Sequence, residues 1–361
     1  MQTQSKFRLL VVRLGAMGDI LHALPAVTAL RQAHPDWVID WVVEPRWEAL
    51  LAAGGSIRLQ GESDSFARNA AQPIVDKLHF APTRGWRKAP LSRNTLREIK
   101  ALRRALRACK YEAVLDLQGA LRSAVVGGLA GSKRLIGEDH PRERAARWLF
   151  TERVHTQGPH VIEQDIELAA AVAGDNLSYL TPLLPVDQDA EAWVDRILPR
   201  DADRPVALIN PGAGWGAKRW PAERYAAVAR GLIDRGLRVL VNVGPGEEPL
   251  AEAIVQSAGE ATPLTCTLKQ LIALTRRVDL ALAGDTGPLH LACALGRPVV
   301  GIYGPTDPSR NGPFGTRFRV LRSPESRRDH TRHATPEAGL MTISPEDVLR
   351  AADELLAEEK A

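Results

Sequence analysis

The chain of 361 residues has little of what is typical of secreted, metal-binding or membrane-embedded proteins. It contains three cysteines, an odd number without metal-ligand spacing, which favours a reducing cytoplasm. Its apolar runs, such as Ala124 to Gly131, fall far short of the roughly 20 residues that cross a bilayer. The apolar run near the N-terminus has the pattern of a strand, so no signal peptide is expected. We therefore predict a cytoplasmic protein.

Aromatic residues are also scarce, at 5% of the chain. Trp86 and Trp148 do not form a stacking ladder in the sequence, so we expect no nucleic-acid partner. Charge is plentiful but uneven. The whole chain carries +4, yet Arg84 to Arg153 holds 17 Lys and Arg against 7 Asp and Glu. A basic segment in an otherwise acidic chain indicates an anionic partner, such as a phosphorylated substrate or a membrane face.

The first half of the chain alternates apolar strands with helical patterns. Predicted strands are Arg8–Arg13, Val38–Val43 and Ala113–Leu117, and predicted helices are Asp19–Ala33 and Ser92–Lys110. In the last helix, Leu96, Ile99, Leu102, Leu106 and Cys109 share one face. Its arginines fall largely off that face, as they do on a solvated helix surface.

The second half repeats the alternation after a Pro- and Asp-rich stretch. Predicted strands are Val206–Asn210, Leu237–Val243, Leu280–Ala283 and Val299–Tyr303, and predicted helices are Ala222–Arg235, Glu247–Ala258, Pro288–Leu295 and Ser344–Glu359. Continuous apolar strands between helices indicate parallel sheets covered on both faces.

The predicted fold class is α/β, with two doubly wound Rossmann-like domains that face a central cleft. We expect an N-terminal domain over residues 1–182, a junction over 183–204, a C-terminal domain over 205–343 and a terminal helix over 344–361. In such sheets, ligands bind in the loops at the carboxyl ends of the strands.

One of these loops matches part of a dinucleotide-binding motif. Gly212, Gly214 and Ala217 fit the pattern G-x-G-x-x-A after a strand. However, Pro221 stands where the helix of the motif should already be running. The next strand ends in "VNVG", with no acid in the usual position to hold a ribose. NAD and FAD are therefore not expected. An Asp-x-Asp pair at 201–203 precedes a strand and is interpreted as linker charge, so no metal centre is predicted.

A second loop has the features of a phosphate site. Asp285, Thr286 and Gly287 precede a proline that suits the first turn of a helix, whose amides and dipole attract a phosphate. Lys218, from a neighbouring glycine loop, supplies a positive charge, and two such elements suit a diphosphate. The alternatives are that Asp285 caps the helix and that His290 is a packed core histidine.

Carboxylates follow two other predicted strands, and each has two interpretations. Asp19 lies beside a glycine turn where a helix begins, so it is either a helix cap or the base of a reaction. Glu247 and Glu248 follow the strand Leu237–Val243, where they either accept from ribose hydroxyls or favour the positive end of a helix dipole.

Three stretches together resemble the ADP-heptose:lipopolysaccharide heptosyltransferases, an inverting family with the GT-B fold. They are "VVRLGAMGDILHALPAV", "GAKRWPAERY" and "GDTGPLHLACALGRPVVGIYGPTDPSRNGPFG", and the resemblance covers nearly the whole chain. The stretches "RGWRK" and "PRERAARWLF" further resemble the heptosyltransferase I branch, which adds the first heptose to the Kdo sugar of lipid A. The resemblance implies an ADP-heptose donor, a Kdo-lipid A acceptor, no cofactor, and peripheral contact with the anionic inner membrane.

The resemblance also implies roles for individual residues. Asp19 matches the proposed catalytic base of the family. Lys218 matches the lysine that meets the donor phosphates, and Asp285, Thr286 and Gly287 match the loop around the diphosphate and heptose. The remaining donor matches are His290 and Glu248, with Glu247 as the alternative to Glu248.

On the acceptor side, the basic residues that face the Kdo carboxylates and lipid A phosphates match Arg84, Lys88, Arg142 and His160, with Arg144 as the alternative to Arg142. Arg13 departs from the pattern, because lysine is common there. Three other functions stay open at this point. They are a type II or III heptosyltransferase or a relative with another sugar nucleotide, a non-catalytic nucleotide-sugar-binding protein, and a Rossmann oxidoreductase.

Overall fold

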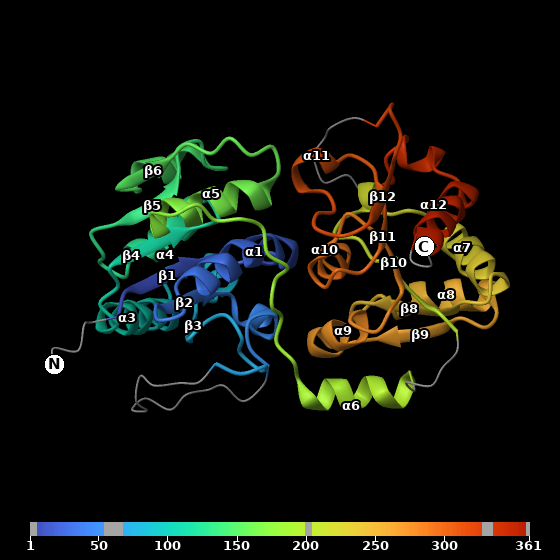
Figure 1. The fold of residues 1–361 in the computed structure, drawn as a ribbon, viewed down its shortest axis with the longest axis horizontal. Coiled ribbons are helices and arrows are strands. Elements are labelled where there is room, and N and C mark those ends of the chain that lie inside the picture. The colour runs from blue at the N-terminus through green and yellow to red at the C-terminus, as the bar shows by residue number, and fades with distance from the viewer. Residues whose placement is uncertain (1–5, 54–67, 199–203, 327–334, 359–361) are drawn as a thin grey trace. The chain divides into compact units, whose positions relative to one another are not determined.

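The computed structural model describes residues 6–53, 68–198, 204–326 and 335–358. The chain divides into two compact units, Met1–Val186 and Asp187–Ala361. The division falls within residues 183–204, which the sequence analysis assigns to a junction. Each unit is a parallel sheet covered by helices, so the predicted α/β class with two Rossmann-like domains is confirmed (Figure 1).

The first unit contains a six-stranded sheet in the order β3-β2-β1-β4-β5-β6, with every pair parallel. Its strands are β1 (Arg8–Val12), β2 (Val38–Val43), β3 (Lys77–Phe80), β4 (Ala113–Asp116), β5 (Leu135–Glu138) and β6 (Glu152–Val154). Its helices are α1 (Met17–Ala33), α2 (Thr83–Lys88), α3 (Arg93–Ala108), α4 (Leu121–Gly128) and α5 (Val161–Ala173). Helices α3 and α4 pack on one face, while α1 and α5 pack together on the other (Figure 1).

Two helices of this unit differ from their predicted form. Helix α1 begins at Met17, so Asp19 lies in its first turn rather than at its start. In α3, Leu102 and Leu106 are buried as predicted, but Leu96 is 52% exposed. The buried leucines of α3 therefore lie in its C-terminal half, and the buried residue of its N-terminal half is Thr95. Ser92 caps the helix by accepting the N–H of Thr95.

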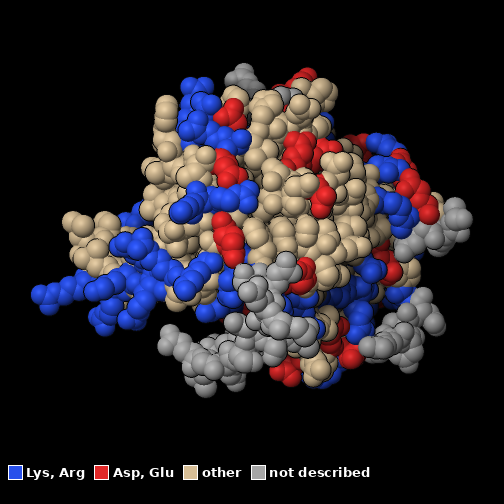
Figure 2. Space-filling view, turned by 60° about the vertical axis from the view of Figure 1, so that its left-hand side comes forward, with Lys and Arg blue, Asp and Glu red and all other residues tan. Residues whose placement is uncertain are grey.

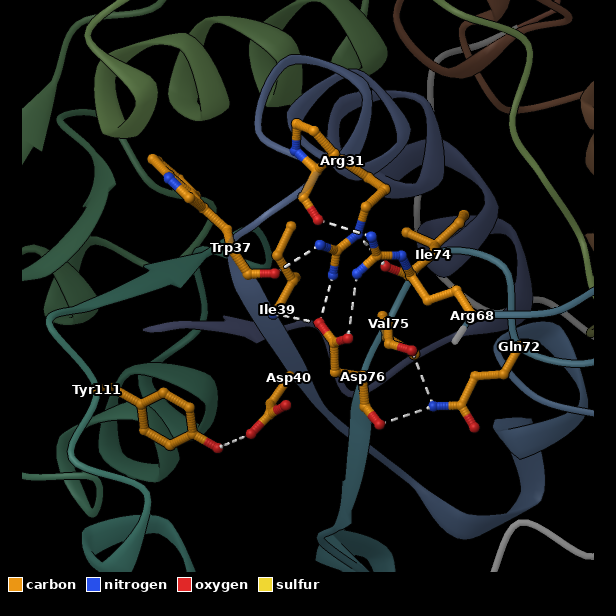
Figure 3. Close-up of polar contacts among 11 residues, drawn as sticks. Arg31, Trp37, Ile39, Asp40, Arg68, Gln72, Ile74, Val75, Asp76 and Tyr111 are labelled. Atoms are coloured by element: carbon orange, nitrogen blue, oxygen red, sulfur yellow. Dashed lines mark hydrogen bonds and ion pairs between the residues drawn. The ribbon is translucent and has the colours of Figure 1, made fainter. Parts of the chain in front are cut away.

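A partly buried ion pair joins α1 to the residue that precedes β3 (Figure 3). Arg31 Nη2 lies 2.5 Å from Asp76 Oδ2, and Arg31 also donates to the carbonyl oxygens of Ile74 and Trp37. Burial lowers the pKa of Arg31, and the charge of Asp76 opposes that shift. Because each N–H of the guanidinium group has a fixed direction, these bonds fix α1 relative to the entry of β3.

The second unit contains a six-stranded sheet in the order β12-β11-β10-β7-β8-β9, again parallel throughout. Its strands are β7 (Val206–Asn210), β8 (Arg238–Val243), β9 (Thr262–Thr265), β10 (Leu280–Gly284), β11 (Val299–Tyr303) and β12 (Phe318–Arg322). Its helices are α6 (Gln188–Ile197), α7 (Ala222–Asp234), α8 (Glu248–Ala258), α9 (Leu268–Thr275), α10 (Gly287–Ala294), α11 (Pro308–Asn311) and α12 (Pro345–Glu358).

Helix ends in this unit follow local chemistry. Ser344 caps α12 by accepting the N–H of Asp347, and Val348, Ala352 and Leu355 pack into the core of the unit. Helix α7 begins only at Ala222, after a proline, so the glycine loop before it does not open a helix. No helix in the described residues is both long enough and apolar enough to span a membrane.

Candidate functional site

The strand orders place a switch point in each unit. In the first sheet, the strand order reverses between the neighbours β1 and β4. In the second sheet, it reverses between β7 and β10. The loops that leave these strands diverge to opposite sides, and open α/β sheets bind ligands at such points. Asp19 follows β1, Lys218 follows β7 and Asp285 follows β10. Asp19 therefore lies at the switch point of the first unit, and Lys218 and Asp285 lie at the switch point of the second.

Asp19 is held by its neighbours on one side and exposed on the other. Its Oδ2 accepts the N–H of Ala16 at 2.8 Å, and its Oδ1 lies 3.6 Å from the Arg13 guanidinium. Arg13, which is buried, also donates to the main-chain oxygen of Asp19 at 3.0 Å. The carboxylate does contribute to the helix start, as the capping interpretation predicts. A third of the side chain nevertheless remains exposed, so it is also accessible to a ligand.

The loop before Asp19 depends on a glycine. Gly15 has φ of +146°, and a Cβ on it would lie within 3 Å of the Trp47 indole. The preceding loop residue, Leu14, donates its N–H to the side chain of Gln118, which follows β4. The loops after β1 and β4 are therefore tied together at the switch point of this unit.

Two buried carboxyl groups lie beneath Asp19. Burial raises the pKa of Asp116 to about 6, against hydrogen bonds from Ser123 and two backbone amides. Burial raises the pKa of Asp165, on α5, to about 7, and the charges of Arg13 and Asp19 act on it in opposite directions. Asp165 therefore holds its proton over much of the range below neutral pH. The sequence did not single out either residue.

We expect Asp165 to make the stability of the protein depend on pH. Its pKa is higher in the folded than in the unfolded chain, so the folded state binds more protons between about pH 4 and 7, and stability falls as pH rises through that window. Asp165→Asn should remove a penalty on the order of a few kcal/mol at pH 8 and have little effect at pH 4. Melting temperatures of both proteins at several pH values test this, with exposed Asp175→Asn as control. Parallel pH curves for the wild type and Asp165→Asn would contradict it.

Basic side chains lie at the carboxyl edge of the first sheet. Arg84, on α2, is exposed and lies 3.8 Å from Glu44, which follows β2. Arg46 lies 3.4 Å from the same carboxylate. Burial lowers the pKa of Arg46, and the positive charges of Arg84 and Arg122 lower it further. Arg46, Arg84 and Arg122 outnumber the buried carboxylate of Glu44, so this edge of the sheet carries a net positive charge. Arg46 and Arg122 were not predicted from the sequence.

The other predicted acceptor residues fall into two groups. Lys88 ends α2 and is exposed, and both Arg142 and Arg144 are exposed near the short 3-10 helix Arg144–Trp148. The N–H of Glu143, between the two arginines, donates to Gly119 after β4, which brings this segment to the same edge. His160 differs, because it is buried and caps α5 by accepting the N–H of Ile162.

In the second unit, Lys218, Asp285 and His290 form one linked group. The Lys218 ammonium pairs with Asp285 Oδ2 and lies 4.6 Å from the centre of the Trp215 ring. His290 Nε2 lies 3.3 Å from Asp285 Oδ1. Burial would raise the pKa of Asp285, but the hydrogen bond from His290 and the charge of Lys218 outweigh it and lower that pKa well below its usual range.

Asp285 is therefore not a simple helix cap. The N-cap of α10 is Thr286, and its side-chain hydroxyl donates to the carbonyl of Gly284. The helix begins at Gly287, so its first amides and the positive end of its dipole lie beside the paired lysine. An anion can bind these groups, because Lys218 has three N–H donors and Asp285 occupies only part of them.

The two glutamates after β8 differ in their placement. Glu248 is exposed, and its carboxylate accepts the N–H of Gly246; the backbone hydrogen bonds at its own N–H and at Gly246 lower its pKa. Glu247 precedes α8, and its carboxylate accepts the N–H of Gly244 and touches Gly212 in the loop after β7. The geometry thus brings Glu247, rather than Glu248, to the switch point of this unit.

Metal-ligating side chains gather elsewhere in the described residues. One group is Asp139, His140 and His155, of which both histidines are exposed. The other is Asp40, His79 and Cys109, although the cysteine spacing in the sequence gave no sign of it. Neither group contains Asp19 or Lys218. The Asp-x-Asp pair at 201–203 lies outside the described residues.

Two Rossmann-like units in one chain are typical of the GT-B fold. Residues 99–340 match the model of glycosyltransferase family 9 (heptosyltransferase). The chain belongs to this family, and it is a transferase.

Curated heptosyltransferases align with most of this chain. Lipopolysaccharide heptosyltransferase 1 of Escherichia coli K12 is 31% identical, over 88% of this chain and 94% of the relative. The enzyme of the same name from Pseudomonas aeruginosa is 28% identical, over 85% and 81% of the two chains. The structure of E. coli heptosyltransferase WaaC with ADP matches with a TM-score of 0.77 and 28% identity, over 97% of this chain and 100% of that chain.

Proposed function

We propose that this protein transfers L-glycero-D-manno-heptose from ADP-heptose to a Kdo residue of Kdo-lipid A, in the synthesis of the lipopolysaccharide inner core. The observation that carries the proposal is the linked group of Lys218, Asp285 and His290 at the switch point, beside the start of α10. Solved relatives support the choice of donor, since E. coli WaaC is described with ADP and with ADP-2-deoxy-2-fluoro heptose. The heptosyltransferase 1 relatives support the choice of acceptor.

In the proposed mechanism, Asp19 is the only catalytic base. Its carboxylate takes the proton of the acceptor hydroxyl as the hydroxyl oxygen attacks the anomeric carbon of the heptose. The bond between that carbon and the diphosphate oxygen breaks on the opposite face, so the configuration inverts. A diphosphate leaves as an anion, and no catalytic acid is required.

The leaving ADP is stabilised by groups of the second unit. Lys218 and the amides at Thr286 and Gly287 bind the negative charge that grows on the diphosphate, without metal. Asp285 and His290 position the lysine and contact the heptose. Glu247 contacts the nucleoside, because its carboxylate lies beside the loop after β7.

The acceptor is proposed to bind the cations at the carboxyl edge of the first sheet. Arg84, Lys88 and Arg142 or Arg144 face the Kdo carboxylates and lipid A phosphates, with Arg46 contributing charge. His160 acts differently from the other residues, since as a buried cap it fixes the start of α5.

Titration with nucleotides tests the donor assignment. We expect ADP to bind more tightly than UDP, GDP or NAD in calorimetry with EDTA present. A preference for UDP or GDP would reassign the donor within the same fold. A preference for NAD, or a strict need for Mg²⁺, would contradict the proposal.

We further propose that the protein works in the cytoplasm, bound peripherally to the inner membrane through α2 and α3. Lys and Arg gather on one part of the surface in Figure 2. The exposed basic residues of the two helices are Arg84, Arg87, Lys88, Arg93, Arg97, Lys100, Arg103, Arg104 and Arg107. Leu91, between the helices, is 85% exposed and suits contact with the interface.

Vesicle binding tests the membrane contact. Each Lys or Arg near an anionic surface contributes about 1 kcal/mol, so replacing Arg97, Arg103 and Arg104 by Gln should weaken binding to phosphatidylglycerol vesicles about 100-fold. The matched control replaces three exposed arginines of the second unit, Arg230, Arg235 and Arg350. Equal affinity of the two triple variants would contradict this role.

A further inference from the structure

A buried polar cluster lies on the face of the first sheet that α3 covers. Asp40 is the third residue of β2 and His79 the third residue of β3. Cys109 follows the last turn of α3, and Tyr111 precedes β4. Asp40, His79 and Tyr111 are each at most 5% exposed, whereas Cys109 is half-buried. Four side chains from β2, β3 and the connection between α3 and β4 therefore converge beside the apolar core.

The ligand atoms of this cluster are close together. One carboxylate oxygen of Asp40, the Cys109 Sγ and a ring nitrogen of His79 all lie within 4.8 Å of one another. His79 Nε2 is 3.8 Å from Asp40 Oδ2 and 2.8 Å from the Tyr111 hydroxyl. That hydroxyl donates to Asp40 Oδ2 at 2.5 Å (Figure 3). The four ligand atoms around a tetrahedral zinc ion lie about 3.4 Å from one another. Small side-chain rotations bring the three ligand atoms of this cluster to that separation.

One atom of the cluster has no hydrogen-bond partner among the described residues. Asp40 Oδ1 is fully buried and has no hydrogen-bond partner in the described part of the chain. A buried carboxylate oxygen without a donor is costly, since it has lost its water without compensation. A cation bound by the Asp40 carboxylate supplies that compensation.

We propose that Asp40, His79 and Cys109 form a binding site for one zinc-like divalent cation, with the Tyr111 hydroxyl or a water as fourth ligand. A carboxylate oxygen, an imidazole nitrogen and a thiolate are the ligands that zinc takes in proteins. Two negative ligands balance the charge of the ion, and the thiol proton is released on binding.

The position of the cation site in the sheet indicates a structural role. Asp40 and His79 lie in the middle of their strands, whereas Asp19 and Arg84 lie at the carboxyl edge of the same sheet. The cation therefore ties α3 to β2 and β3 and does not take part in transfer. The inference is independent of the proposed reaction, so its test needs no substrate.

Cobalt titration of the full chain tests the site. We expect one Co²⁺ to bind per chain, with an intense near-ultraviolet band from charge transfer between thiolate and cobalt, and Zn²⁺ to displace it. Cys109→Ser should abolish that band and weaken binding at least 10-fold. Asp40→Asn, which can still accept from Tyr111, should weaken binding and keep the band. Circular dichroism establishes that each variant is folded.

Two controls separate this cluster from other ligands. Cys266→Ser, which removes another partly buried thiol, should leave the band and the affinity unchanged. His155→Gln, in the exposed group with Asp139 and His140, should also leave the band unchanged, because that group has no sulfur. Absence of the band in the wild type, or a band that persists in Cys109→Ser, would overturn the proposal.

Discussion

Asp19→Asn is expected to lower the rate of heptose transfer by about 10²- to 10⁴-fold. The amide still accepts the N–H of Ala16, so the first turn of α1 keeps its shape. It has no negative charge for Arg13 and cannot take the proton of the attacking hydroxyl. A loss of this size reflects the missing base rather than a change of shape, because the Asn side chain differs from Asp only in an NH2 group that replaces one carboxylate oxygen.

The loss should be confined to catalysis. ADP affinity is expected to stay within twofold of the wild type, because the donor groups belong to the second unit. Asp36→Asn, an exposed carboxylate just after α1, is the matched control and should retain full turnover. Turnover near the wild-type rate in Asp19→Asn would remove Asp19 from its role as base.

Lys218→Ala is expected to weaken ADP binding by about 10- to 100-fold. A hydrogen bond to a charged group contributes roughly 1.5–3 kcal/mol, and the ammonium is the cation beside the start of α10. The substitution also removes the ammonium that pairs with the Asp285 carboxylate and leaves its contact with His290, so the negative charge of Asp285 then repels a diphosphate. Both effects lower affinity in the same direction.

Calorimetry with ADP and with adenosine separates a phosphate contact from a general loss of the site. Adenosine affinity should change little in Lys218→Ala, while ADP affinity falls. Lys269→Ala, which breaks an ion pair with Asp187 near the start of α9, serves as control. Unchanged ADP affinity in Lys218→Ala would show that this lysine does not contact phosphate.

The fold was predictable because its strands are continuous apolar runs. Segments such as Val206–Asn210 are buried at every position and match the prediction residue for residue. Helix starts were harder, since they depend on single hydrogen bonds. Asp19 was expected to begin α1, but the helix begins two residues earlier, with Ala16 as its N-cap.

The residues of each site were predictable only where residues close together in the sequence form a recognisable motif. The loops after β1, β7 and β10 stand out in the sequence because glycine, proline and charge occur together. The pairing of Lys218 with Asp285 was not visible, since 67 residues separate them. Arg46 and Asp165 are significant only through neighbours that the fold brings to them. The Asp40, His79 and Cys109 cluster has no spacing motif for the same reason.

The central claim is tested most directly by a transfer assay with purified protein, ADP-heptose and EDTA. Two acceptors are compared: Kdo-lipid A without heptose, and the same lipid already carrying its first heptose. We predict that mass spectrometry detects one added heptose on the first acceptor and none on the second. Transfer only to the heptose-bearing acceptor would assign a type II or III activity. Donor binding with no transfer to either acceptor would contradict the proposed function.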